Sequence, residues 1–97
     1  MAAVPIEQVY RQIVEFARAA GARRVVLFGS RARGTNQPRS DIDLAVEGCP
    51  DFPDLEDRLQ NELWSLLRLD VVNLDDPVSD DLRAEIARDG KVLYEEV

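Results

Sequence analysis

The 97-residue chain contains no histidine and only one cysteine. The absence of histidine excludes Ser–His and Cys–His catalysis, and it excludes zinc sites that use imidazole ligands. The single thiol, Cys49, can form neither an intrachain disulfide nor a thiolate metal cluster, and no histidine is present to activate it as a nucleophile. We therefore interpret Cys49 as a passive thiol.

Positive charge is also scarce, because 12 Lys and Arg residues face 19 Asp and Glu residues and the net charge is −7. This balance argues against direct nucleic-acid binding, which depends on basic side chains neutralising phosphates. It suits metal ions or a basic protein partner. No apolar run approaches the roughly 18 residues of a membrane span, and the first residues lack a signal-peptide pattern. We expect a cytoplasmic protein without membrane contact.

The length and the apolar periodicity predict one small domain over residues 1–97, with room for one core but not for a separate substrate domain. Pro5 and Gly21 suit the two ends of a first helix, and Ser79 and Gly90 suit those of a last one. The predicted elements are helix 5–20, strand 25–28, a polar loop opening with a helical turn, strand 41–46, helix 53–67, strand 69–74, helix 80–88 and strand 91–94. The expected fold is mixed α/β (α+β), a small mixed sheet with helices packed on it.

Two aspartates stand two residues apart on the second predicted strand. Asp41 and Asp43 should project from one face of that strand, while Ile42, Leu44 and Val46 occupy the opposite, buried face. Two adjacent carboxylates repel each other unless a cation compensates for them. Mg²⁺ prefers oxygen ligands and is often held by one or two carboxylates together with substrate phosphates. The pair therefore predicts a magnesium site.

A third carboxylate, Asp70, lies at the start of the next predicted strand. If the two strands are neighbours, Asp70 reaches the same site, and three carboxylates can hold the two ions used for in-line nucleotidyl transfer. The alternative is that Asp70 is an exposed carboxylate or a cap at the start of the strand.

The Gly29-Ser30 turn directly follows the first buried strand. Backbone N–H groups at such a turn can cradle a triphosphate, with Gly29 allowing close approach and Ser30 adding a hydroxyl donor. Arg31 and Arg33 could neutralise phosphate charge or lie in a solvated loop, and Gly34 would let the chain reverse.

The string LFGSRARGTNQPRSDIDLAV resembles the active-site signature of the DNA polymerase beta-like nucleotidyltransferase superfamily: Gly-Ser, ten residues, then Asp-x-Asp. The shortness of the chain, together with DVVNL and the terminal GKVLYE, resembles the minimal nucleotidyltransferase (MNT) subgroup. The resemblance implies a polymerase beta-like fold. It also implies that Gly29 and Ser30 hold nucleotide phosphates and that Asp41 and Asp43 bind magnesium.

The family's third carboxylate lies on a later strand, and Asp70 is the natural match, although Asp75 and Asp76 follow closely. Catalytic and metal-binding roles then fall to Asp41, Asp43 and Asp70.

The MNT resemblance also implies a biological role. MNT proteins are commonly antitoxins paired with a HEPN-domain ribonuclease toxin, and they resemble adenylyltransferases that move AMP from ATP onto a toxin tyrosine. This predicts ATP as substrate, two Mg²⁺ ions and a possible hetero-oligomer with the toxin. The alternatives are an antitoxin that neutralises by binding alone and adenylyl transfer to a small molecule such as an aminoglycoside.

The helix predicted over 53–67 should bury a leucine stripe made of Leu55, Leu59, Leu63, Leu66 and Leu67. Trp64 lies off that stripe. An off-stripe tryptophan indicates either a partner surface, where tryptophan is enriched, or a residue folded over the edge of the core.

Overall fold

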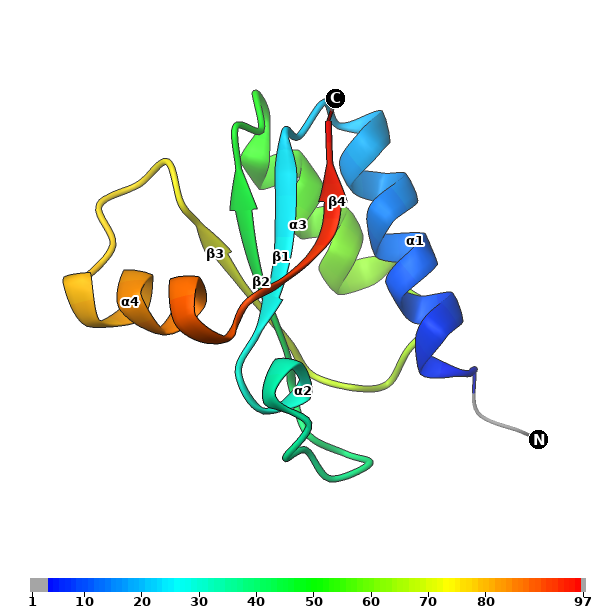
Figure 1. The fold of residues 1–97 in the computed structure, drawn as a ribbon. Helices are drawn as coiled ribbons and strands as arrows, with labels where there is room; N and C mark the ends of the chain where they lie inside the picture. The colour runs from blue at the N-terminus through cyan, green and yellow to red at the C-terminus, as the bar shows by residue number, and fades with distance from the viewer. Residues whose placement is uncertain (1–3, 97) are drawn as a thin grey trace.

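The helices and strands form in the predicted order, and all but the third helix keep close to their predicted bounds. The computed structural model describes residues 4–96 (Figure 1). Its elements are α1 (Ile6–Ala19), β1 (Arg24–Phe28), α2 (Ser30–Arg33), β2 (Ile42–Glu47), α3 (Phe52–Asn61), β3 (Leu69–Asn73), α4 (Asp80–Asp89) and β4 (Lys91–Glu95). The α/β prediction of a small mixed sheet with helices on it is confirmed.

The four strands form one sheet in the order β3-β2-β1-β4. β1 runs antiparallel to both β2 and β4, whereas β2 and β3 are parallel. The register pairs Phe28 with Asp43 and Asp43 with Asp70. The end of β1 therefore lies beside the starts of β2 and β3, at one end of the sheet.

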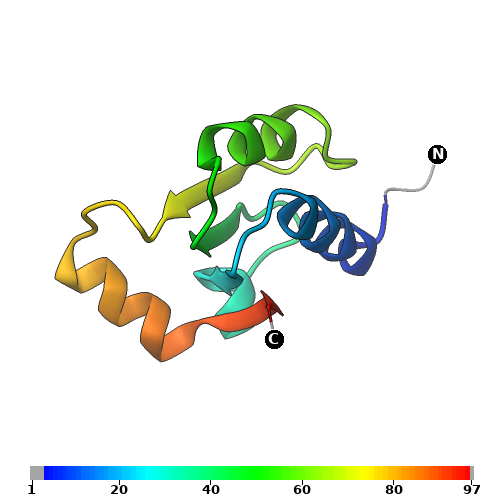
Figure 2. The same cartoon turned by 90° about the horizontal axis from the view of Figure 1, so that it is seen from above.

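Helices cover both faces of the sheet, α1 and α3 on one face and α4 on the other (Figure 2). Alternation along each strand divides the apolar side chains between these faces. The core under α1 and α3 includes Val9, Ile13, Ala17, Val25, Leu27, Ile42, Leu44, Val46, Leu55 and Leu59. The smaller core under α4 consists of Val26, Phe28, Ala45, Leu74 and Ile86.

The third helix ends earlier than its leucine spacing predicts, at Asn61 rather than near Leu67. The Asn61 amide donates back to the carbonyl oxygen of Asp57 at 3.0 Å, and the Gln60 amide donates to the carbonyl of Leu69 at 2.9 Å. The bond from Gln60 ties the end of α3 to the first residue of β3. Leu66, expected on the buried stripe, is fully exposed.

The last helix follows its capping signals. The Leu82 N–H donates to the Ser79 hydroxyl at 3.2 Å, which satisfies one of the free donors of the first turn of α4. The helix ends at Gly90, as predicted. In the described part of the chain, no helix has the length and apolarity to cross a lipid bilayer.

Candidate active site

The face of the sheet that α4 only partly covers carries the predicted carboxylates. Ile42, Leu44 and Val46 are completely buried on the α1–α3 side, as expected. Asp43 alternates with them and shares the opposite face with Ala45, which packs under α4. Ala45 is completely buried and Asp43 is only half-buried. Helix α4 therefore buries this face less completely toward the end of the sheet where the carboxylates lie.

Gly29 brings the backbone at the end of β1 against Asp43. Its φ of 74° and ψ of −157° lie in a region that residues with a Cβ essentially do not enter. A Cβ built on Gly29 would overlap the Asp43 carboxylate and lie 3.1 Å from its Cγ. Only glycine therefore permits this approach of the Gly-Ser turn to the carboxylate strand.

The short helix α2 begins at Ser30, directly after this contact. The Gly29 carbonyl accepts from the N–H groups of Ala32 and Arg33, both at 3.1 Å. The N–H groups of Ser30 and Arg31 belong to the first turn, which has no preceding helical carbonyl for them to reach. Gly34, at φ 78°, ends the helix in the left-handed conformation.

Arg31, predicted as a phosphate contact, uses its guanidinium to fasten the loop that leads into β2. Its Nε and Nη2 donate to the Ser40 carbonyl at 3.0 and 2.9 Å, and Nη2 also donates to the Pro38 carbonyl at 3.0 Å. These bonds fix the approach to Asp41. The geometry supports a structural function for Arg31, and its contact with a nucleotide stays a prediction.

Arg33 is placed differently, with its charge directed toward acidic groups. Its Nη1 lies 3.6 Å from the Asp89 carboxylate at the end of α4. The same carboxylate pairs with Arg88 at 3.0 Å and is only 15% exposed. The charge of Arg33 also acts favourably on the Asp43 carboxylate. Arg33 therefore lies between α4 and the carboxylate strand.

Asp70 is the β3 partner of Asp43 in the parallel pair and lies on the same face of the sheet. The Arg68 Nε lies 3.8 Å from its carboxylate. The other candidate in this stretch, Asp75, has a different role: its Oδ2 accepts from the Gly48 N–H at 2.9 Å, past the far end of β2. Of the later acidic residues considered, Asp70 is therefore the one beside Asp43.

The pKa of Asp43 is raised above its ordinary value, first because the group is partly buried. Repulsion from Asp70, Asp41 and Glu85 raises it further, and Arg33 partly opposes the rise. Sequence reasoning missed Glu85, which is half-buried on α4. The signal was present: Glu85 adjoins Ile86, a buried residue of α4, so it lies close to the sheet-facing side of that helix.

Within residues 4–96, no three acidic or cysteine side chains are gathered closely enough to form a ready metal cluster. The chemistry of the donors nonetheless suits Mg²⁺, because carboxylate oxygens are the ligands that it prefers. The mutual repulsion that raises the pKa of Asp43 is the kind that a divalent cation relieves.

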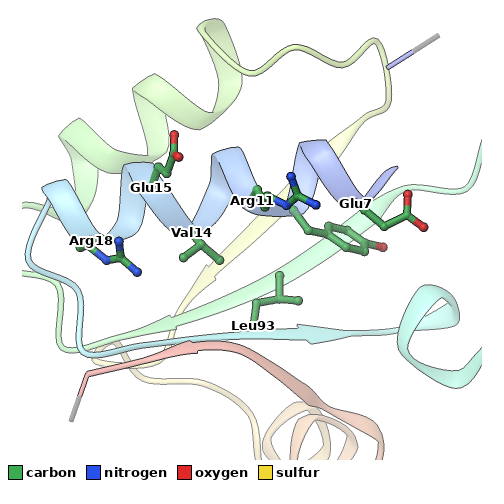
Figure 3. Close-up of a pocket in the computed structure, with 7 residues that line it drawn as sticks. Glu7, Arg11, Val14, Glu15, Arg18 and Leu93 are labelled. Carbon is green, nitrogen blue, oxygen red and sulfur yellow. The ribbon is translucent and has the colours of Figure 1, made fainter. Parts of the chain in front are cut away.

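Two surface hollows, each of about 390 Å³, lie away from these carboxylates. The first is a groove between α1 and β4, where Val14 and Leu93 face each other between charged side chains (Figure 3). The second lies between α4 and the sheet and is lined by Val26, Leu74 and Ile86 among others. Neither includes Gly29, Ser30 or the three aspartates, so neither supplies walls for a substrate at the carboxylates.

Known structures share this fold. A toxin–antitoxin crystallised with AMP-PNP is 28% identical to this chain, with a TM-score of 0.70 over 90% of this chain and 73% of its own. A structure described as a minimal nucleotidyltransferase is 27% identical, with a TM-score of 0.68 over 89% and 90%.

A complex of a tri-AMPylated Shewanella oneidensis HEPN toxin with an MNT antitoxin is 24% identical, with a TM-score of 0.66 over 93% of this chain and 72% of its own. At that identity the likeness concerns the fold alone. No protein of curated function matches the sequence.

The family model described as polymerase beta, nucleotidyltransferase matches residues 11–97. That range contains the Gly-Ser turn, both strands that carry the aspartates, and α4. The chain therefore belongs to the polymerase beta nucleotidyltransferase family.

Proposed function

We propose that this nucleotidyltransferase is an antitoxin that transfers AMP from ATP to a hydroxyl group of a HEPN-type toxin. One observation carries the proposal: Gly29, Asp43 and Asp70 come together at one end of the sheet, because β1 ends where β2 and β3 begin. Family membership supports nucleotidyl transfer. The similar toxin–antitoxin structure with AMP-PNP supports ATP as the donor and a toxin as the partner.

The carboxylates would hold the metal. Asp41 and Asp43 would bind one Mg²⁺, and Asp70 would share a second with them. Bound Mg²⁺ would neutralise the negative charge of the ATP phosphates. The crowding at Asp43 supports this assignment, because the site carries repulsion that a cation would remove.

The nucleotide phosphates would lie over the start of α2. The Ser30 hydroxyl and the N–H groups of the first turn would supply donors to them. Arg33 is placed to add positive charge beside Asp43. Arg31 would act indirectly, by holding the loop before Asp41.

In the transfer step the acceptor hydroxyl oxygen attacks the α-phosphorus of ATP. A bond forms between that oxygen and the α-phosphorus, the bond from the α-phosphorus to the bridging oxygen breaks, and pyrophosphate leaves with the electron pair. Asp70 accepts the hydroxyl proton and releases it to solvent. Most of the lowering of the reaction barrier would come from positioning of the reactants and neutralisation of charge.

The acceptor would be a tyrosine on the toxin, as the resemblance to MNT proteins implies. The excess of acidic residues suits a basic, RNA-binding partner. Neither of the two hollows described above adjoins the carboxylates, so neither supports transfer to a small molecule.

The test is to incubate the chain with Mg²⁺, α-labelled ATP and the purified product of the gene next to its own. Label should enter that protein with wild type and should be lost with Asp41→Asn, Asp43→Asn and Asp70→Asn. A tight complex without label would instead favour an antitoxin that acts by contact alone. Full labelling by Asp43→Asn would overturn the proposal.

A further inference from the structure

Two large apolar side chains are exposed on one short segment. Trp64 is 71% exposed and Leu66 is fully exposed, and both belong to residues 62–68, which join α3 to β3. We call this segment the rim loop. The exposure of Trp64 excludes the alternative that its ring folds over the core edge.

The rim loop is held firmly while it presents these side chains. The Trp64 N–H donates to the Gln12 side chain of α1 at 2.7 Å, and the Leu67 N–H donates to the Ser65 hydroxyl at 3.1 Å. Leu63 and Leu67 pack against the main core. A surface that is already ordered loses little conformational entropy when a partner binds.

The rim loop ends beside the carboxylates. The Arg68 carbonyl accepts a hydrogen bond from the N–H of Ile42, the residue between Asp41 and Asp43, at 2.9 Å. The Arg68 side chain also approaches Asp70. Asp70 follows Leu66 by only four positions in the chain, a span of at most about 14 Å. Figure 1 shows the loop passing the same end of the sheet as α2. A protein bound on the loop would therefore reach the site.

The surroundings of the loop are acidic. Residues 54–70 contain five acidic and two basic residues. The two basic residues are engaged, because Arg58 pairs with Asp54 at 3.2 Å and Arg68 approaches Asp70 at 3.8 Å. Glu62 is exposed next to the apolar pair, and Asp57 is exposed one turn earlier in α3. This charge complements a basic partner surface.

We propose that Trp64 and Leu66 dock the acceptor protein, through an apolar pocket on that protein bordered by basic side chains. The inference rests on the proposed function, which requires a protein acceptor, and it adds where that acceptor sits. Trp64 is the expected centre of the contact, since tryptophan is enriched among the residues that dominate binding energy.

The test measures labelling by α-labelled ATP at increasing concentrations of the acceptor, the product of the gene next to this one. Trp64→Ala should raise the KM for the acceptor about thirtyfold, and Leu66→Ser should raise it less. The KM for ATP, the kcat at saturating acceptor and the Tm should not change. Val92→Ser is the matched control, because Val92 is an exposed apolar residue (53%) on β4.

The outcomes separate the two proposals. If wild type labels the acceptor and Trp64→Ala labels it with the same KM, the docking inference is wrong and the proposed function stands. If wild type neither labels nor binds the acceptor, both fail. If Trp64→Ala turns a dimer of this chain alone into a monomer, the loop pairs two copies and the inference is overturned. A KM for the acceptor that does not rise with salt would exclude a basic border.

Discussion

At the residue scale, the site depends on the contact between a glycine and a carboxylate. Gly29 approaches Asp43 so closely that any side chain at position 29 would displace the carboxylate. Asp43 is already crowded by burial and by neighbouring acidic groups. The position of Asp43 therefore costs stability, as is common at functional sites.

Asp43→Asn should abolish transfer and should also raise the Tm of the metal-free chain, because it removes a charge that burial and neighbouring carboxylates disfavour. Because the pKa of Asp43 is raised in the folded state, the native carboxylate costs stability as the pH rises past its ordinary value of 3.8. The difference in stability between Asp43→Asn and wild type should be largest at pH 7. It should vanish in acid, where the Asp43 carboxyl is protonated in both the folded and the unfolded state. Thermal melts across pH check this, and a variant less stable than wild type at pH 7 would contradict it.

Gly29→Ala should destabilise the chain by about 1–3 kcal/mol and abolish transfer, because of its backbone conformation and the collision with Asp43. Gly34→Ala is the matched control: its φ is also positive, at 78°, but nothing lies within 4 Å of the added Cβ. Gly34→Ala should destabilise the chain less than Gly29→Ala and should keep most of the transfer activity. Equal losses in the two variants, measured by thermal melts and label transfer, would argue against the close approach.

At the scale of elements, arginines join α2 to its surroundings. Arg31→Gln removes guanidinium bonds to the Ser40 and Pro38 carbonyls and should cost about 1–2 kcal/mol, with slower transfer, because the loop before Asp41 loosens. Arg39→Gln, at an exposed position in the same loop, is the control and should change neither. Denaturant unfolding and label transfer measure both effects. An unchanged stability for Arg31→Gln would refute the fastening role.

The contact between α4 and α2 should orient Arg33. Asp89→Asn should weaken ATP binding a few-fold, because Asp89 holds the Arg33 guanidinium on the side of the carboxylates. Arg33→Gln should weaken binding at least as much, and the double variant should be no worse than Arg33→Gln. Titration of ATP with Mg²⁺ measures all three. Additive losses would show that Asp89 acts by another route.

Local patterns predicted most elements, because each was bounded by a strong signal. Gly21, Ser79 and Gly90 mark ends that the structure keeps within a residue or two. The predicted end of α3 was wrong, because leucine spacing alone cannot reveal where the helix stops. The Gln60 side chain donates to the Leu69 carbonyl and ties the end of the helix to β3. Strand pairing, and with it the meeting of Asp43 and Asp70, depends on contacts that are distant in sequence.

At the scale of the whole molecule, the sheet presents its carboxylates at an end that α4 covers only partly. The motif residues could be named from the sequence, because their types and spacing are specific to the family. The roles of Arg31, Glu85 and Asp89 could not, because they depend on how α2 and α4 approach the sheet. Under the proposed function, the nucleotide would lie at this end of the sheet and the acceptor would come from a second protein.

The most direct measurement compares α-labelled with γ-labelled ATP in parallel reactions containing Mg²⁺, the chain and the product of the neighbouring gene. Nucleotidyl transfer predicts that the α-label enters the acceptor protein, while the γ-label leaves as pyrophosphate. It also predicts loss of the α-label with Asp43→Asn. Entry of the γ-label into the acceptor, or undiminished α-labelling by Asp43→Asn, would contradict the account.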